Sequence, residues 1–295
     1  MELVPGALID SHVHLWDLDR FTYPWLQEEG EVLRRNYLPS HLAQHQAGLG
    51  IAGSVFVQAD CLPGQALAEA RWVQQLAYGG ASIVGIVAGA QLEFADGLLE
   101  RLEVLAEIPL VVGVRRLLQD EAAGFVTSDA MVTGTRQLAE FGLTMDLCIR
   151  EWQLAEAAAL VDACPAVEFV VDHLAKPTIT NSAFAAWASD LARLAERPNV
   201  RCKLSGLATE ADEPMRSAEA LRPWLEHAIA VFGPERCMFG SDWPVLATAR
   251  TYEWWVDVVL SVLSGLDQHE RELVLNGTAS ETYDSRRRSA QLKEW

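Results

Sequence analysis

The chain has 295 residues, of which 50% are hydrophobic and 22% are charged, and its formal net charge is −18. A chain of this length can bury a large core, so neither disulfides nor a metal is needed to stabilise one or two domains. The strong acidity argues against nucleic acids and anionic membranes as partners, and we interpret the short basic run at 286–288 as a solvated end.

Eight short apolar runs follow one another along the chain, each rich in Val, Ile, Leu or Phe. They are residues 7–10, 54–60, 83–90, 110–117, 143–149, 167–173, 200–206 and 236–242. Most are too continuously apolar for half-exposed antiparallel strands and are typical of parallel strands that are buried on both faces. Helical patterns, with Leu, Ala and aromatic residues every three or four positions, occupy 64–80, 94–108, 151–163, 184–196 and 221–233.

This alternation predicts an α/β protein, a distorted (β/α)8 TIM barrel formed by a single domain over residues 1–295. A doubly wound open sheet is the alternative, but it usually carries a glycine-rich phosphate loop after its first strand, where this chain reads SHVHLWD. The long connection over residues 15–53 contains FTYPWL and one short helical pattern at 39–48. Its length suits a loop that folds over the barrel mouth.

Polar residues lie at the ends of most predicted strands, where active sites of this fold form. They are Asp10, His12, His14, Gln58, Asp60, Arg115, Arg116, Asp146, Asp172, His173, Lys176, Lys203, Ser205, Ser241 and Asp242. Ionisable groups from at least six strands are thus expected to converge on one cup. His12 and His14 are one residue apart, so they project from the same side of an extended backbone.

Several of these residues also have a purely structural interpretation. Asp10 is expected to orient a histidine or to cap a loop rather than to react, and strand alternation lets only one of Arg115 and Arg116 face inward. Asp242 precedes Trp and Pro and could cap a turn. Lys203 is costly to bury inside a barrel unless it is paired, which favours a functional role.

Seven motifs occur in a recognisable order: HVHLWD, FVQAD, GVRRLL, DHLAKP, CKLSGL, FGSDWPV and LVLNGTASETYD. From about Ile9 to Tyr283 the chain therefore resembles the amidohydrolase superfamily, and more narrowly its branch of sugar lactonases and dicarboxylate lactonases. The resemblance implies a distorted TIM barrel that hydrolyses a cyclic ester, with His12, His14, His173 and Asp242 as catalytic residues. The predicted substrate-binding residues are Trp25, Gln58, Asp60, Arg115, Asp146, Lys176, Lys203 and Trp243.

The chain departs from the binuclear members of that superfamily at two strands. It has no lysine at the end of the fourth strand, which reads GVRRLL, and no histidine at the end of the fifth, which has Asp146 and Cys148. We therefore expect either no cofactor or one divalent metal ion, zinc or manganese. Its ligands are predicted to be His12, His14 and Asp242, with His173 available as a fourth.

The predicted reaction is ester hydrolysis (EC 3.1.1.-) of a sugar lactone. Asp242 is the candidate general base, with a pKa raised by burial, and the histidines polarise the carbonyl directly or through one ion. A monoacid aldonolactone is favoured over a dicarboxylate pyrone, because the cup offers few cations. The alternatives are a metal-dependent decarboxylase of the aminocarboxymuconate or orsellinate type, which relies on a strand-5 histidine, and a sugar-acid-binding protein on an inactive barrel.

The five cysteines are scattered and form no CxxC pair, which predicts free thiols in a reducing compartment. The N-terminal stretch MELVPGALID lacks the basic start and apolar run of a signal peptide, and no apolar stretch approaches the roughly 20 residues of a membrane span. We therefore expect a cytoplasmic monomer or homodimer whose partner is a small-molecule substrate.

Overall fold

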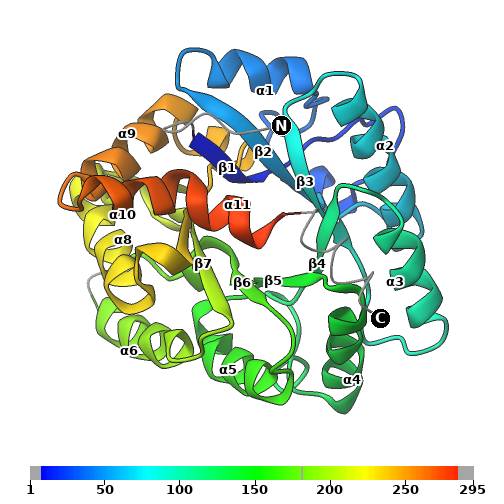
Figure 1. Cartoon of the computed structure of the whole chain (residues 1–295). Coiled ribbons are helices and arrows are strands. Elements are labelled where there is room, and N and C mark those ends of the chain that lie inside the picture. The colour runs from blue at the N-terminus through cyan, green and yellow to red at the C-terminus, as the bar shows by residue number, and fades with distance from the viewer. Residues whose placement is uncertain (1–7, 181, 285–295) are drawn as a thin grey trace.

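Eight parallel strands form a nearly closed barrel at the centre of the computed structural model, which describes residues 8–180 and 182–284. The strands are β1 (Leu8–Val13), β2 (Ile51–Val57), β3 (Ile83–Gly89), β4 (Val111–Leu117), β5 (Thr144–Cys148), β6 (Phe169–Val171), β7 (Val200–Leu204) and β8 (Cys237–Phe239). Each pairs with the next along the chain, and helices surround them (Figure 1), so the predicted (β/α)8 barrel is confirmed. β1 continues beyond its predicted end at residue 10. The described residues do not include the basic run 286–288. They also leave out residues 1–7, most of the segment that was expected to lack a signal peptide.

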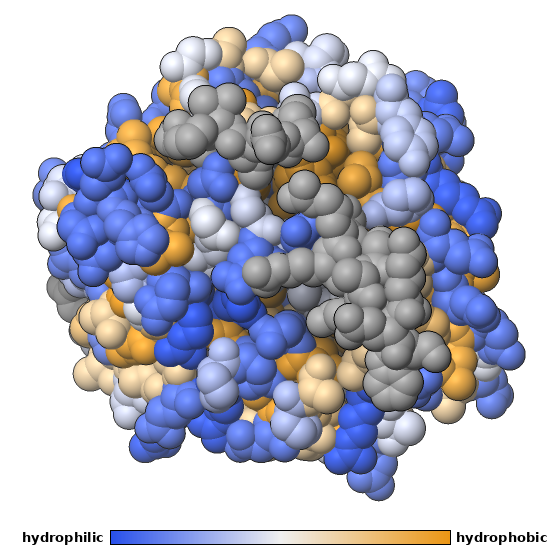
Figure 2. Space-filling model, viewed as in Figure 1, coloured by the Kyte–Doolittle hydropathy of each residue, from blue (hydrophilic) through white to orange (hydrophobic). Residues whose placement is uncertain are grey.

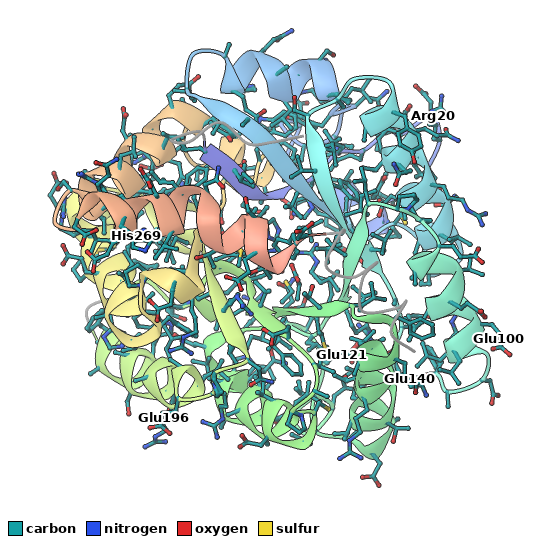
Figure 3. All side chains as sticks on the ribbon, viewed as in Figure 1. Arg20, Glu100, Glu121, Glu140, Glu196 and His269 are labelled. Atoms are coloured by element: carbon teal, nitrogen blue, oxygen red, sulfur yellow. The ribbon has the colours of Figure 1, made fainter. Side chains whose placement is uncertain are left out.

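Helices form the outer layer. They are α1 (Pro39–Gln46), α2 (Ala66–Tyr78), α3 (Leu98–Ala106), α4 (Asp129–Gln137), α5 (Leu154–Ala163), α6 (Phe184–Ala195), α7 (Leu207–Glu210), α8 (Ala218–Phe232), α9 (Tyr252–Leu263), α10 (Gln268–Glu272) and α11 (Thr278–Thr282). The five predicted helical segments are found in α2, α3, α5, α6 and α8. Hydrophilic residues dominate the periphery of the face in Figure 2, and Glu100 and Glu196 point away from the barrel in Figure 3. Within the described ranges, every helix falls short of the length and apolarity that a membrane crossing requires.

The barrel interior is closed at the amino ends of the strands by α11, which crosses the middle of the barrel in Figure 1. Ala279 and Tyr283 pack there against inward-facing strand residues such as Val55, Val112 and Met238. Because this end is filled with apolar side chains, the open end lies at the carboxyl ends of the strands. That is where the predicted site residues were expected.

The first and last strands are joined by a side chain as well as by backbone. Their backbone contact is an isolated bridge between Val13 and Trp243. The buried Asp10 carboxylate crosses the same gap and accepts hydrogen bonds from the Ser241 N–H (2.8 Å), the Ser241 hydroxyl (2.5 Å) and the His12 N–H (3.1 Å). Asp10 therefore fixes the ends of β1 and β8 relative to each other.

The long connection between β1 and β2 is anchored to α2 by a buried carboxyl group. The Tyr23 hydroxyl donates to Oε1 of Glu69 at 3.0 Å, and Glu69 is only 1% exposed. Nearby, the Trp25 indole N–H donates to the carbonyl of Ala59 at 2.8 Å. These bonds hold the loop over the barrel mouth, as its length predicted.

The buried Glu69 predicts a pH-dependent stability. Burial raises the pKa of its carboxyl group from 4.5 to about 7. Because the folded state holds the proton more tightly, the stability contributed by this group is complete below pH 4.5 and is lost as the pH rises through 7. Glu69→Gln keeps an acceptor for Tyr23. We expect its free energy of unfolding to exceed that of the wild type by up to about 3 kcal/mol at pH 8–9, and we expect this difference to disappear below pH 5. Urea unfolding at each pH measures this difference. The exposed Glu100→Gln is the control, and a pH-independent difference for Glu69→Gln would contradict the prediction.

Candidate active site

Asp242 lies among three imidazoles at the carboxyl ends of β1, β6 and β8. Its Oδ1 is 3.3 Å from Nε2 of His14, 3.7 Å from Nε2 of His12 and 3.8 Å from Nε2 of His173. The Nε2 atoms of His12 and His14 are 3.2 Å apart. All four side chains are buried. The structure thus brings the four residues that were predicted to be catalytic around one point.

Local backbone geometry aims these side chains. Alternation along β1 places His12 and His14 on one side of the strand. Asp242 (φ 61°) and the whole segment from His173 to Lys176 adopt left-handed conformations, which cost non-glycine residues of order 1–3 kcal/mol each and cluster at functional sites. At Gly206 a Cβ atom would lie 2.6 Å from the His173 ring, which explains the glycine of CKLSG.

The outer nitrogen of each imidazole has a polar neighbour. Nδ1 of His14 lies 2.8 Å from the carbonyl of Val57, which can only accept, so Nε2 of a neutral His14 carries a lone pair. That lone pair faces the Asp242 carboxylate, so a proton on Nε2 or a metal ion is needed between them. Nδ1 of His173 lies 2.8 Å from the Ser205 hydroxyl. Such outer contacts orient imidazoles that act as ligands.

Burial sets the charge state of these groups. It lowers the pKa of His173 to about 4, and together with the Lys203 ammonium it lowers the pKa of His12 well below its usual value. Both imidazoles are therefore neutral at pH 7, the form that binds metals. Burial alone would raise the pKa of Asp242, but the attraction of His173 and the other imidazoles outweighs it, and the pKa lies below its usual range. The raised pKa predicted for Asp242 from the sequence is wrong, because that prediction considered burial and left out the imidazoles.

The donor set fits one divalent metal ion. Ligand atoms of His12, His173 and Asp242 lie within 4.8 Å of one another, and Nε2 of His14 adds a further donor. With zinc–nitrogen bonds of roughly 2.0–2.1 Å, neighbouring ligands of a tetrahedral site are about 3.3 Å apart. The separations of 3.2 Å between His12 and His14 and 3.3 Å between His14 and Asp242 match this spacing. Imidazole and carboxylate donors also suit zinc or manganese.

A cavity of about 590 Å³ adjoins the cluster. The predicted site residues that line it are His14, Trp25, Asp60, Arg115, His173, Lys176 and Asp242. His12 is fully buried behind them, with its Nε2 3.4 Å from Nη1 of Arg115. Of the two strand-4 arginines, Arg115 is the one that reaches the histidines, as alternation required, whereas Arg116 pairs with Glu93 at 2.8 Å.

Lys203 and Asp146, which were predicted to bind the substrate, do not line this cavity. They lie in the barrel interior, where Nζ of Lys203 is 2.5 Å from Asp146 and 3.0 Å from Asp172. The hydroxyl of Tyr283 donates to Asp146 at 2.9 Å. Lys203 also lies 3.1 Å from Nδ1 of His12, so this buried network supports the site from below.

Gln58 and Trp243, which were also predicted to contact the substrate, do not line this cavity, and Gln58 lines a second cavity beside it. The side-chain oxygen of Gln58 accepts a hydrogen bond from the Asp60 N–H at 2.6 Å, and the backbone carbonyl of Gln58 accepts one from Arg115 at 2.6 Å. Gln58 therefore supports two residues that do line the cavity. The Trp243 ring packs against His45 of α1 and lines a separate cavity.

Asp172, to which no role was assigned from the sequence, lies at the centre of the network. Its Oδ2 accepts from Nη1 of Arg115 at 3.1 Å, and its Oδ1 lies 3.2 Å from Nδ1 of His12. Its position just before His173 at a strand end was the available signal. The acidic residues of the cavity rim, on loops whose paths no local pattern indicates, were also missed: Glu28, Glu29, Asp120 and Glu121.

Comparison with known proteins agrees with this geometry. The amidohydrolase family profile matches residues 9–284. An L-fucono-1,5-lactonase of Burkholderia multivorans is 36% identical over 297 residues, covering 94% of this chain and 96% of that protein. A crystal structure of an amidohydrolase from Burkholderia multivorans with bound zinc has a TM-score of 0.83 at 32% identity, covering 94% of this chain and 99% of that one. A 2,6-dihydroxybenzoate decarboxylase from Rhizobium shares only the fold, with a TM-score of 0.61 at 12% identity over 94% of this chain and 98% of that one. This chain belongs to the amidohydrolase family.

Proposed function

We propose that this enzyme hydrolyses an aldonolactone, the cyclic ester of a sugar acid, to the open-chain aldonate, and that one domain over residues 1–295 carries the reaction. The observation that carries the proposal is the Asp242 carboxylate within 3.8 Å of three imidazole nitrogens beside a cavity of about 590 Å³. The lactonase relative, 36% identical over nearly the full length, supports ester hydrolysis as the reaction class.

Asp242 is the candidate general base. Its low pKa keeps the carboxylate ionised, so it can take a proton from a water molecule that attacks the lactone carbonyl carbon. Arg115, whose Nη1 lies 3.4 Å from Nε2 of His12, is the cationic donor beside the oxyanion that forms. When the bond between the acyl carbon and the ring oxygen breaks, the protonated Asp242 returns the proton to that oxygen. The product is a carboxylate with a free hydroxyl group.

One divalent ion held by His12, His14 and Asp242, with His173 as a fourth donor, would supply Lewis-acid polarisation of the carbonyl. The residues below the cluster keep its geometry, since Asp172 and Lys203 both contact His12. Gly206 leaves room for the His173 ring.

The charges in the cavity support a neutral lactone over one that carries extra carboxylates. Arg115 is paired with Asp172, Arg116 with Glu93, and Lys176 lies 3.8 Å from Glu210. By contrast, in residues 8–180 and 182–284 the cavity-lining carboxylates Glu28, Glu29 and Asp60 form no ion pair. Unpaired carboxylates accept hydrogen bonds from sugar hydroxyls and repel anionic groups.

A decarboxylase is the alternative, since such enzymes share the barrel. Their dependence on a strand-5 histidine is not met, because β5 ends in Cys148 and its inward Asp146 is paired with Lys203. Release of acid without carbon dioxide from a common substrate panel would separate the two reactions.

A pH-indicator screen of aldonolactone stereoisomers tests the proposal. We expect at least one aldono-1,5- or 1,4-lactone to be hydrolysed with kcat/KM above about 10⁴ M⁻¹ s⁻¹, the lower end of the usual range for enzymes. Aldarolactones, which carry an additional carboxylate, are the matched comparison and should react at least tenfold more slowly. An inactive enzyme across the whole panel, with or without added metal, contradicts the proposal.

Removal of metal is expected to lower activity. Enzyme dialysed against a chelator should lose at least tenfold in kcat and regain it with one equivalent of zinc or manganese per chain. The reason is that Nε2 of a neutral His14 and the Asp242 carboxylate, both acceptors, face one another across the cluster. Elemental analysis gives the stoichiometry. Full activity in metal-free enzyme would show that protons on the imidazoles take the place of the ion.

The proposal includes a cytoplasmic location and a monomer or homodimer. All five cysteines are buried and free, which supports a reducing compartment. Sedimentation of the purified enzyme measures its oligomeric state.

A further inference from the structure

β3 contributes no charged side chain to the active-site cavity, and it ends in small residues instead. Gly89 is its last residue and Ala90 follows it. Above this end lies a second cavity of about 300 Å³, bounded by the start of α2 and by α3. A water molecule occupies about 30 Å³ in the liquid, so the space is large enough for a small organic substituent.

The side cavity shares part of its wall with the active-site cavity. The shared residues are Asp60, Arg115, Arg116 and Leu117. Nη1 of Arg115 is 3.4 Å from Nε2 of His12, so the side cavity begins next to the atoms that surround the reacting carbonyl. A group attached close to that carbonyl can therefore reach it.

The lining of the side cavity defines what it can hold. Ala66, Leu67 and Leu105 give it an apolar wall, and Asp60 supplies a carboxylate without an ion pair among the described residues. Arg116 and Arg101 line it as well, but Arg116 is paired with Glu93 and Arg101 donates to the carbonyls of Phe94 and Asp96. The guanidinium of Arg115 is already bonded to Asp172 and to the Gln58 carbonyl. Because the cationic groups of its wall already have partners, such a space suits a short, uncharged carbon chain.

We propose that the side cavity above β3 is the subsite for the exocyclic carbon of the lactone, the substituent on the ring carbon that bears the leaving oxygen. This inference rests on the proposed function and extends it to substrate selection. In a 1,5-lactone this substituent is separated from the carbonyl carbon only by the ring oxygen and one ring carbon, which matches a subsite that begins beside Arg115. Ala66, Leu67 and Ala90 are then specificity-determining residues.

Two lactones that differ only in this substituent test the subsite. L-Fucono-1,5-lactone carries a methyl group where D-arabinono-1,5-lactone, of the same ring configuration, carries hydrogen. Ala90→Leu and, separately, Ala66→Leu fill the side cavity. We expect each to lower kcat/KM for the methyl-bearing lactone at least tenfold and to leave that for the pentonolactone within twofold. Ala249→Leu, at the separate cavity beside Trp243, is the matched control and should change neither.

Each outcome decides one point. Equal loss on both lactones in a folded variant, or no loss on either, overturns the subsite while the proposed function stands. A wild-type enzyme that hydrolyses neither these lactones nor any other aldonolactone overturns the proposed function, and the subsite with it. Circular dichroism and melting temperature show whether each variant is folded. If one of the two variants does not fold, the other still tests the subsite.

Discussion

Asp242→Asn is expected to lower kcat for lactone hydrolysis by roughly 10³-fold while the barrel remains folded. The amide occupies the same space beside the imidazoles, but it cannot accept the proton of the attacking water. General base catalysis contributes roughly 10²–10⁴-fold in enzymes. Steady-state kinetics at saturating zinc separate this loss from any loss of metal, because Asp242 is also a candidate ligand.

The matched control is Asp120→Asn, which makes the same chemical change at the exposed rim of the same cavity. Its kcat should stay within about threefold of wild type. An Asp242→Asn enzyme that retains a comparable kcat would remove Asp242 from the role of base. An unchanged near-ultraviolet circular dichroism spectrum of Asp242→Asn would show that its lower kcat comes from the chemical step and not from a change in fold.

Lys203→Met is expected to destabilise the protein by about 3–5 kcal/mol. Lys203 is fully buried with Asp146 and Asp172, and their negative charges raise its pKa although burial alone would lower it. Removing the ammonium leaves the Asp146 carboxylate without a cation in the barrel interior and Asp172 with Arg115 alone, which is the costly way to break a buried pair. Urea unfolding measures the loss. Arg222→Met, which breaks the exposed pair with Glu226, should cost no more than about 1 kcal/mol.

A second substitution should restore part of this loss. Asp146→Asn in the Lys203→Met background removes one uncompensated charge and keeps an acceptor for the Tyr283 hydroxyl. The double variant should therefore be more stable than Lys203→Met alone, by at least about 1 kcal/mol. Strictly additive losses would mean that the two groups do not interact.

The strands and the catalytic cluster could be predicted because both depend on short-range rules. Continuous apolar runs identify buried parallel strands, and alternation along β1 places His12 and His14 on one side. The barrel then brings the carboxyl ends of all strands together, so His173 and Asp242 could be joined to them without knowledge of the loops.

Depth along the barrel axis could not be predicted in the same way. Lys203 and Asp146 face inward, as residues of buried strands can, yet they lie below the cavity and pair with each other. Which layer a residue occupies depends on the stagger between strands, and no local pattern reports it. The direction of the Trp243 ring could not be predicted either, because the left-handed turn at Asp242 directs the next side chain toward α1.

The contact between β1 and β8 has a consequence for how the enzyme folds. Asp10 bonds to Ser241 across 231 positions of sequence, and the imidazoles of one strand meet the carboxylate of the other at that junction. A nascent chain that has not yet released β8 from the ribosome therefore lacks the Asp242 carboxylate of the candidate catalytic cluster and is expected to be inactive. In refolding, turnover should therefore return only once β8 has joined β1.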